Sequence, residues 1–260
     1  MIDFSNENIL HVRANDEIEY IQFRKLLEYN DKIRHCYTIK PQDFRNKTKD
    51  SAECQNISKI LGIKSESINM PIQTHTNIVK VAEKNCSSKD FQDVDGLITG
   101  EIEKTLLTVT ADCTAFILYD PVKNVIGNIH SGWKGTVNKI GKVAIEELSK
   151  KYGSRPEDII CCICPTIRQC HFEVEDDVKD LFIKAFEDES IIKMGEIKDG
   201  KQKYFIDTVA ANKKMFINCG LQPENIIDSG ICTLCYHNKF HSYRYAGKDA
   251  GRSGAIIGLI

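Results

Sequence analysis

The chain has 260 residues, of which 42% are apolar and 28% charged, and its formal net charge is -2. These values are ordinary for a globular protein with one sizeable core, and the small charge gives no electrostatic reason to expect nucleic acid or an anionic membrane as a partner. No apolar run approaches the roughly 18–20 residues that a membrane-spanning helix needs. The first residues lack the basic start and apolar core of a signal peptide.

The number of cysteines is high and odd, at eleven. Disulfides are rare in reducing compartments, and no secretion signal is visible in this sequence. We therefore expect a cytoplasmic protein in which most cysteines are small buried thiols. One or two of them could serve as metal ligands or nucleophiles.

Short strands and helices alternate in the first part of the chain. Asp50 and Ser51 can cap a helix that ends at about Leu61, before Gly62. Helical spacing is also present over 23–29. The expected strands cover residues 18–23, 34–39, 68–72, 77–82 and 106–109, with a turn over 93–96.

A hairpin is expected in the middle of the chain. Residues 115–119 and 125–129 are apolar and rich in Val, Ile, Phe and Leu, and residues 120–124 supply the reversal. Cys113 stands just before the first strand and His130 just after the second. Because a hairpin returns the chain to its starting end, we expect these two side chains to lie close together.

The second half predicts a helix over 137–148 that ends near Gly153, because its apolar residues recur at helical spacing. Further helices are expected over 175–188 and 207–219, and strands over 159–163, near 226 and after 254. Helices and strands are interleaved irregularly, without a repeat or a linker. This pattern favours a single α+β domain spanning residues 1–260.

The sharpest chemical pattern is the set His75, Cys113 and His130, each at the edge of an expected strand. Two imidazoles and a thiolate form a three-ligand zinc set that leaves a fourth position for water or substrate, and zinc lowers the pKa of bound water to about 7. Two other readings stay open. The residues could be a buried cysteine with two hydrogen-bonded histidines, or His130 could activate Cys113 as a nucleophile without metal.

Two further groups suit anion binding. Ser131 to Gly135 places two glycines around Trp133 ahead of an expected helix, with Lys134 adding a charge. A structural turn is the alternative, and the tryptophan could stack on a planar ring. Arg244 and Arg252 have serine and glycine neighbours and suit phosphate or carboxylate recognition, although surface ion pairs are a common role for arginine.

A cysteine-rich set could hold structural zinc. Cys161 and Cys162 are adjacent on an expected buried strand, so their side chains point to opposite faces. The pair Cys232 and Cys235 has no second CxxC partner. We therefore expect buried thiols throughout this set, which consists of Cys161, Cys162, Cys164, Cys170, Cys232 and Cys235.

Taken together, the motifs resemble those of the family once labelled multicopper polyphenol oxidase or laccase-domain proteins, now associated with purine nucleoside chemistry. The resemblance runs from about Arg34 to the C-terminus. It rests on the order of residues 73–75, 95–99, 110–113, 130–136, 164–167, 172–174, 207–212, 232–233, 242–244 and 251–252.

The resemblance implies an α+β fold with mixed sheets between helices, distantly similar to the Cys–His catalytic domains of certain bacterial toxins. It implies zinc bound by His75, Cys113 and His130. It also implies phosphorolysis of adenosine, inosine or guanosine to base and ribose 1-phosphate, with adenosine deamination and methylthioadenosine phosphorolysis. The expected partners are purine nucleosides and phosphate, and the expected state is a monomer or homodimer.

Roles for other residues follow from that activity. Asp112, with Asp95 as the alternative, would move protons beside the metal. Phosphate would be bound by Lys134, where the family usually has arginine, and by Arg244 and Arg252. Gln73 and Trp133 complete the expected substrate-binding set, which consists of Gln73, Trp133, Lys134, Arg244 and Arg252.

Two other function classes remain open on the sequence. One is a metal-free Cys–His hydrolase or transferase, and the other is a nucleoside-binding protein with structural zinc. Oxidation chemistry of the laccase type is excluded, because multicopper oxidases hold their coppers with many His-x-His pairs. This chain has seven histidines and no such pair.

Overall fold

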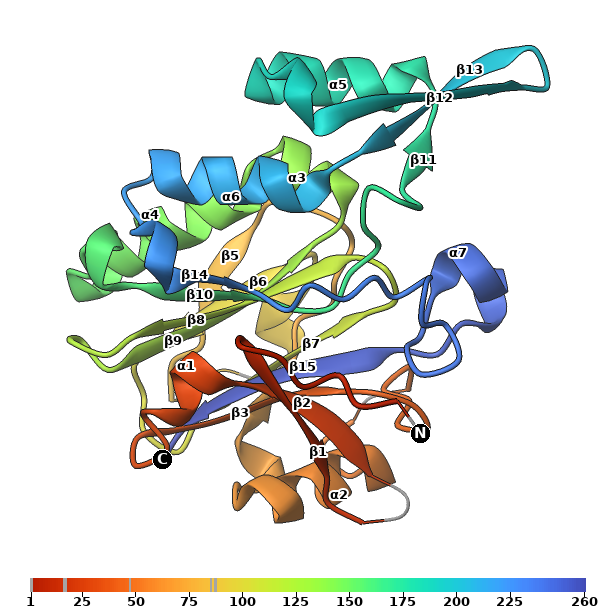
Figure 1. Cartoon of the computed structure of the whole chain (residues 1–260). Helices are drawn as coiled ribbons and strands as arrows, with labels where there is room; N and C mark the ends of the chain where they lie inside the picture. Colours follow the sequence, from red (N-terminus) through yellow and green to blue (C-terminus); the bar gives the residue numbers. More distant parts are fainter. Residues whose placement is uncertain (1, 16–17, 47, 85, 87) are drawn as a thin grey trace.

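Two six-stranded sheets lie face to face at the centre of the molecule (Figure 1). The computed structural model describes residues 2–15, 18–46, 48–84, 86 and 88–260. Apolar side chains from both sheets form the largest core cluster, which includes Leu106 and Ile257 from one sheet and Ile117 and Tyr119 from the other. This layer joins residues from almost the whole length of the chain.

The first sheet has the order β1-β2-β3-β15-β7-β4. Its strand β15 is fully buried and pairs antiparallel with both β3 and β7, so the last strand lies among strands from the first half of the chain. The strands are β1 (Ile9–Arg13), β2 (Glu19–Phe23), β3 (Ile33–Thr38), β4 (Ile68–Asn69), β7 (Thr105–Thr110) and β15 (Ser253–Leu259).

The second sheet has the order β14-β10-β8-β9-β6-β5. Its middle is the predicted hairpin of β8 and β9, whose residues are all buried because both faces of the sheet are covered. The strands are β5 (Val79–Val81), β6 (Gly96–Thr99), β8 (Thr114–Asp120), β9 (Val125–Ser131), β10 (Ile160–Ile163) and β14 (Ile226–Asp228).

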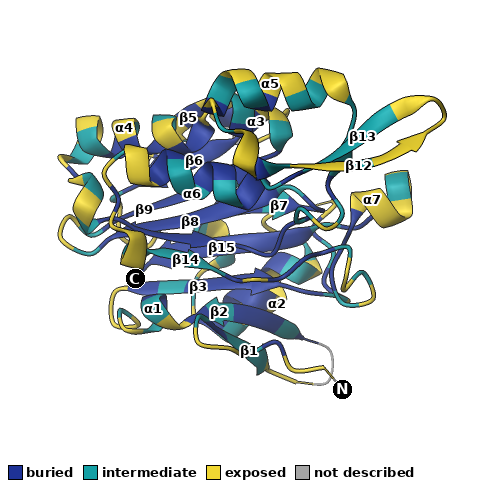
Figure 2. Ribbon diagram, turned by 45° about the horizontal axis from the view of Figure 1, so that its top comes forward, coloured by how far each residue is buried: buried dark blue, intermediate teal, exposed yellow. Residues whose placement is uncertain are grey.

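Helices cover the outer faces of both sheets (Figure 2). A second core cluster packs α4 (Ile140–Tyr152) and α6 (Thr208–Asn218) against the second sheet through Ile145, Leu148 and Phe216. A third packs α2 (Ala52–Leu61) against the first sheet through Ile57 and Leu61. The expected α+β fold with mixed sheets between helices is therefore confirmed.

The helix over 52–61, α2, begins and ends at residues with a clear local cause. Ser51 accepts a hydrogen bond from the Cys54 amide at the start of α2, and Gly62 ends it with a φ of 67°. No helix in the described part of the chain is long and apolar enough to cross a bilayer. The helices are α1 (Arg24–Leu27), α2 (Ala52–Leu61), α3 (Trp133–Val137), α4 (Ile140–Tyr152), α5 (Asp176–Phe186), α6 (Thr208–Asn218) and α7 (Tyr243–Ala246).

A small third sheet projects from the two main layers together with α5 (Figure 1). It consists of β11 (Glu173–Val174), β13 (Lys201–Ile206) and β12 (Ile192–Lys198). The sequence did not predict this sheet, because β12 and β13 are rich in lysine, most of β12 is exposed and most of β13 is only half-buried. Strands without a buried face lack the alternation on which sequence prediction depends.

Two other expectations about the elements were wrong in detail. The helix expected over 137–148 is α4, which begins three residues later because Lys139 adopts a left-handed φ of 56° and separates it from the short helix α3. The turn expected over 93–96 ends one residue early, and Gly96 already begins β6. A bulky cross-strand neighbour explains the glycine, since a Cβ there would lie 2.7 Å from Cδ1 of Ile129.

Candidate metal and substrate site

The β8–β9 hairpin brings Cys113 and His130 to the same end of the second sheet, as predicted. In its register Thr114 pairs with Ser131 and Ala115 with His130, so Cys113 stands at the strand end beside the histidine. His75 reaches the same point from the segment between β4 and β5. The ligand atoms of all three residues lie within 4.8 Å of one another.

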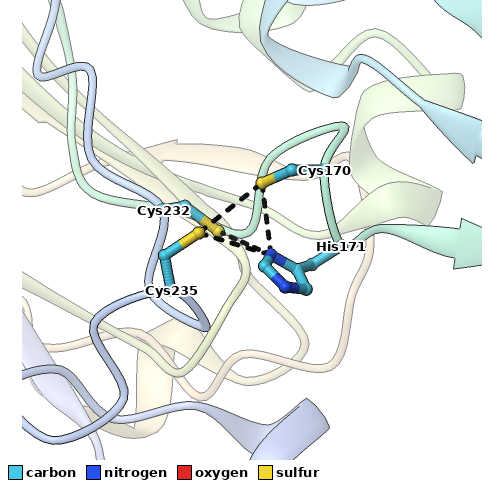
Figure 3. A group of neighbouring side chains, drawn as sticks. All are labelled: Cys170, His171, Cys232 and Cys235. Carbon is cyan, nitrogen blue, oxygen red and sulfur yellow. Dashed lines mark hydrogen bonds between the residues drawn. The ribbon is translucent and has the colours of Figure 1, made fainter.

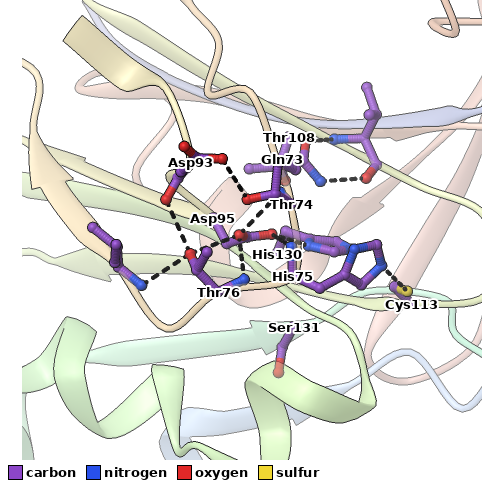
Figure 4. Close-up of polar contacts among 12 residues, drawn as sticks. Gln73, Thr74, His75, Thr76, Asp93, Asp95, Thr108, Cys113, His130 and Ser131 are labelled. Atoms are coloured by element: carbon purple, nitrogen blue, oxygen red, sulfur yellow. Dashed lines mark hydrogen bonds and ion pairs between the residues drawn. The ribbon is translucent and has the colours of Figure 1, made fainter.

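A buried carboxylate, Asp95, organises the two histidines (Figure 4). Its Oδ1 accepts hydrogen bonds from Nδ1 of His130 at 2.7 Å and from the amide of His75 at 3.1 Å. The amides of Thr74 and Thr76 and the Thr76 hydroxyl donate to Oδ2. Since Nδ1 of His130 is used in this way, its Nε2 faces the cluster, as in carboxylate–histidine–metal arrangements.

The backbone around His75 is held in an uncommon conformation. His75 has a φ of 65°, in the left-handed region that costs a non-glycine residue free energy. Gly132 stands directly against the cluster, because a Cβ there would lie 2.7 Å from Cδ2 of His75 and 3.2 Å from the Cys113 sulfur. The cluster therefore requires glycine at position 132.

The local charges favour a thiolate beside an imidazolium when no metal is bound. Burial opposes ionisation of Cys113, but the charge and hydrogen bond of His130 and the hydrogen bond of His75 outweigh it and lower the pKa to about 6. Burial likewise opposes charging of His130, while Cys113 and Asp95 raise its pKa to about 9. Asp95 itself is a carboxylate, because the groups that donate to it hold its pKa at about 2 despite burial.

One sulfur and two imidazole nitrogens are donors that zinc prefers. The Cys113 sulfur lies 3.8 Å from Nε2 of His75, close to the separation of about 3.5 Å expected between sulfur and nitrogen ligands on one tetrahedral zinc ion. The residues present therefore fit a metal. The set leaves a fourth position, which is typical of catalytic rather than structural sites.

This cluster opens onto a cavity of about 550 Å³. Its wall combines strand ends of both main sheets with the segments around residues 166–172 and 243–244. The lining residues are Gln73, His75, Val109, Thr110, Ala111, Asp112, Cys113, Thr114, His130, Ser131, Trp133, Thr136, Thr166, Ile167, Phe172, Thr208, Tyr243, Arg244 and Arg252. A cavity of this size accommodates a ligand as large as a nucleoside.

Asp112 lies in the wall with its carboxylate fully engaged. It accepts hydrogen bonds from the Thr233 hydroxyl at 2.6 Å, the Ser242 hydroxyl at 3.0 Å and the amide of Arg244 at 2.7 Å. Its φ is 78°, a second left-handed residue beside the site. These contacts suit a residue that positions the segment carrying Arg244, and its expected role in proton transfer stays a prediction.

The other predicted substrate residues are only partly brought together. Gln73 lines the cavity, but its amide exchanges hydrogen bonds with the main chain of Val109 at 2.8 and 2.9 Å. Trp133 is half-buried in the wall at the start of α3. Lys134 is exposed, with its ammonium 5.6 Å from the Trp133 ring, and lies outside the described lining.

Arg244 and Arg252 both reach the cavity wall. Arg244 donates to the carbonyls of His171 and Glu173, and Arg252 donates to those of Ala250 and Gly251. Neutral carbonyls hold both guanidinium groups, and neither forms an ion pair with a carboxylate within the described part of the chain. The nearby carboxylates of Asp112 and Asp43 accept instead from the main-chain amides of Arg244 and Arg252, at 2.7 and 2.9 Å.

Sequence reasoning missed how Asp95 acts, since it considered this residue only as an alternative proton carrier. Its position before Gly96, at the start of a buried strand, was the available signal. Phe172 and Tyr243 were also missed as wall residues, because the loops that carry them lie apart in the sequence.

The expectation of buried thiols was right for four of the six cysteines, since Cys232 is buried as well as the three of residues 161–164, and wrong for the other two. Cys161, Cys162 and Cys164 are buried, as expected. Cys170 and Cys235 are exposed, because they lie on loops rather than on strands.

The fold and this Cys–His cluster define a recognisable class. Residues 43–260 match the family model described as multi-copper polyphenol oxidoreductase laccase. The chain is 32% identical over 195 residues to purine nucleoside phosphorylase YlmD of Bacillus subtilis, a match that covers 72% of this chain and 68% of that protein. The chain therefore belongs to this laccase-domain family, as its motifs indicated.

Other relatives and solved structures agree with that assignment. Adenosine deaminase RL5, from an unknown prokaryotic organism, is 32% identical over 201 residues, which cover 74% of this chain and 75% of that protein. YlmD from Geobacillus stearothermophilus has the same fold, with a TM-score of 0.83 at 22% identity over 97% of this chain and 99% of that one. The YfiH protein of Bacillus licheniformis matches with the same TM-score and identity over 95% and 98%.

Proposed function

We propose that this chain is a zinc-dependent purine nucleoside phosphorylase that converts adenosine, inosine or guanosine with phosphate into base and ribose 1-phosphate. We include adenosine deaminase and methylthioadenosine phosphorylase activity in the proposal. The observation that carries it is the convergence of His75, Cys113 and His130 on a cavity that two arginines also line. The names of relatives at about a third identity support phosphorolysis of purine nucleosides and deamination of adenosine.

The phosphate would bind at the arginines. Arg244 and Arg252 line the cavity and are held by main-chain carbonyls, which leaves further N–H groups for an anion. Guanidinium groups bind phosphate through paired hydrogen bonds. In phosphorolysis they would orient the phosphate toward C1′ as positive charge develops on the ribose.

The nucleoside would occupy the apolar part of the wall. The aromatic rings of Phe172 and Tyr243 line the cavity, and Trp133 lines it at the start of α3. Planar purines stack favourably on aromatic rings and gain hydrophobic free energy on leaving water. Exposure of half of Tyr243 keeps its ring accessible to an entering ligand.

His75, Cys113 and His130 would hold the zinc ion. Bound there, zinc supplies a Lewis acid that activates water near neutral pH for deamination. Asp95 fixes the tautomer and direction of His130, and Gly132 leaves the room that His75 needs. Asp112 holds the segment of Arg244 and, by prediction, exchanges a proton with the substrate.

The decisive experiment is chromatography of adenosine and inosine incubated with the purified chain, with and without phosphate. We expect hypoxanthine and ribose 1-phosphate from inosine only when phosphate is present, and inosine from adenosine in either case. His75→Ala should abolish all products, because the ligand set is broken. His11→Ala, which changes a histidine on the remote strand β1, should leave them unchanged.

Product formation by His75→Ala at the wild-type rate would refute the proposed site. Absence of any product from the wild type, with adenosine still bound, would leave a binding protein as the function. Elemental analysis adds a second criterion, since zinc should bind to the wild type and be lost from this site in Cys113→Ala.

A specific observation also favours a second candidate, a metal-free Cys–His hydrolase or transferase. The lowered pKa of Cys113 beside His130 is the arrangement of an activated thiolate. Inactivation of zinc-free, active enzyme by a thiol reagent would support it against the leading proposal.

The number of domains, the compartment and the oligomeric state are also proposals. We propose one domain over residues 1–260, because β15 completes the sheet that β1, β2 and β3 begin. Eleven free thiols suit a reducing compartment such as the cytoplasm. The state as monomer or homodimer can be measured by light scattering.

A further inference from the structure

A second group of soft metal donors lies outside the first cluster (Figure 3). Cys170 and His171 come from the loop between β10 and β11, and Cys232 and Cys235 from the segment after β14. One ligand atom from each of the four residues lies within 4.8 Å of the other three. None of these residues belongs to the first cluster, and the proposed function does not use them.

The separations match those of four ligands around one tetrahedral ion. The sulfurs of Cys170 and Cys235 are 3.7 Å apart. Nδ1 of His171 lies 3.2 Å from the Cys170 sulfur, 3.6 Å from that of Cys232 and 3.4 Å from that of Cys235. Zinc bond lengths predict about 3.8 Å between two sulfur ligands and about 3.5 Å between sulfur and nitrogen.

The backbone already holds the two donor loops side by side. Thr166 and Cys232 form a parallel bridge. In it the amide of Thr166 donates to the carbonyl of Ile231, and the amide of Thr233 donates to the carbonyl of Thr166. Cys232 and Cys235 are three residues apart in a turn, where the amide of Tyr236 donates to the Cys232 carbonyl. Donors that are ordered before binding lose little conformational entropy when the metal arrives.

We propose that Cys170, His171, Cys232 and Cys235 bind a second zinc ion in a closed structural site. Three thiolates and one imidazole complete a tetrahedron, which leaves no position for substrate and is typical of structural zinc. Soft sulfur donors also disfavour magnesium and calcium, which take oxygen ligands. The alternative fate of these thiols is a disulfide between Cys170 and Cys235, which would use only two of the four donors.

The site would stiffen one wall of the cavity. The carbonyl of His171 accepts a hydrogen bond from Arg244, and the next residue, Phe172, lines the cavity. Thr233, between the two later cysteines, donates to Asp112. A metal at these loops therefore ties together the segments that carry the proposed phosphate-binding arginine and an aromatic face.

Elemental analysis of the purified full-length chain tests the proposal independently of any activity. We expect two zinc ions per chain in the wild type, one in Cys113→Ser, one in the double variant Cys170→Ser/Cys235→Ser, and none when all three changes are combined. Cys219→Ser, at a half-buried cysteine outside both clusters, is the control and should retain two. A wild type with one zinc ion that Cys170→Ser/Cys235→Ser still retains would overturn the proposal.

Cobalt substitution gives a second readout that distinguishes the sites by their sulfur content. Three of the four thiolate–cobalt bonds belong to the proposed site, so Cys170→Ser/Cys235→Ser should remove about three quarters of the thiolate-to-cobalt charge-transfer absorbance. Retention of zinc by its first site would show that this variant is folded. An unchanged spectrum, or a Cys170–Cys235 disulfide found by peptide mass analysis of the native protein, would contradict the proposal.

Discussion

The two Cys–His clusters of this protein differ in how the chain supplies and supports their donors. Cys113 and His130 stand at the ends of buried strands, His75 stands on the segment between β4 and β5, and the buried Asp95 accepts hydrogen bonds from both histidines. Cys170, His171, Cys232 and Cys235 stand on two surface loops joined by a single parallel bridge. The first has three donors and faces a cavity, whereas the second has four donors that face one another.

The difference between the buried, strand-supported cluster and the loop-supported cluster indicates which kind of metal site each support suits. An incomplete ligand set is useful only when its open position is held rigidly against a substrate, and strand ends with a buried carboxylate provide that rigidity. Surface loops lack such support, so a metal ion with a complete ligand set must itself hold the loops in place. Substitutions that loosen one cluster should therefore leave metal at the other.

The largest effect is expected from Arg168→Met, which removes an ion pair that supports the loop of the second cluster. Arg168 forms two hydrogen bonds of 2.8 and 2.9 Å with Asp228 on β14, and it lies two residues before Cys170. Loss of this partly buried ion-pair partner should cost at most about 3 kcal/mol of unfolding free energy, the lower limit for fully buried pairs, because Arg168 is partly exposed and Lys213 still contacts Asp228. Urea denaturation measures this cost.

The same variant should change metal behaviour at one cluster only. Zinc release to a chelator should become faster for the second cluster and stay unchanged for the first. A Cys113→Ser background, which retains only the second cluster, and a Cys170→Ser/Cys235→Ser background, which retains only the first, allow the two rates to be measured separately. Equal acceleration at both clusters would mean that they are not independently supported.

Asp95→Asn should have the next largest effect, and on the first cluster alone. Asparagine has one acceptor oxygen where Asp95 has two, so it cannot accept from His130 on one side and from the Thr74 and Thr76 donors on the other, and the orientation of His130 is weakened. Removing such a partner lowers metal affinity by about 10–100-fold. Competition with a zinc indicator measures the change, and an affinity equal to that of the wild type would remove Asp95 from the site.

A buried histidine far from both clusters gives a reference for pH effects. His35 on β3 accepts from the amide of Phe23, and burial lowers its pKa to about 3. The unfolded chain binds a proton near pH 6.5 that the folded chain does not, so stability falls as pH decreases below 6.5. Between pH 6.5 and 5 the loss should be about 2 kcal/mol.

His35→Gln should remove this part of the pH dependence, as urea denaturation at pH 8 and pH 5 would reveal. The variant should gain about 2 kcal/mol relative to the wild type between these two values. A constant difference between variant and wild type would show that His35 is protonated in the folded state.

Gly132→Ala is expected to have the smallest effect, and it tests the geometry of the first cluster. The new Cβ would meet His75 at 2.7 Å, so the imidazole must move by several tenths of an ångström. We expect about a tenfold loss of nucleoside turnover, because small displacements of a metal ligand disturb the transition state. Unchanged zinc content at the second cluster is the internal control.

Much of the fold could be predicted from local sequence. Ser51 and Gly62 mark the ends of α2 because capping depends on neighbouring residues alone. The hairpin of β8 and β9 was predictable because two apolar runs enclose an obvious reversal. From that hairpin alone, Cys113 and His130 could be placed together.

Recognition of His75 as the third member of the cluster came from motif resemblance as well as from strand edges. No periodicity brings residue 75 to residue 113, since their contact depends on the left-handed turn at His75 and on its amide bond to Asp95. The polar strands β12 and β13 also escaped prediction, because neither face of their ribbon is fully buried.

By itself, the sequence determined the ligand set of the first cluster and most of the strands and helices of the two main sheets, because these depend on side-chain chemistry and on neighbours along the chain. Only the tertiary structure decided how the ligands group. It separated Cys170 and Cys235 from the buried cysteines of β10 and joined them to His171 and Cys232. Contacts over more than sixty residues are set by the packing of sheets and loops, which no local pattern encodes.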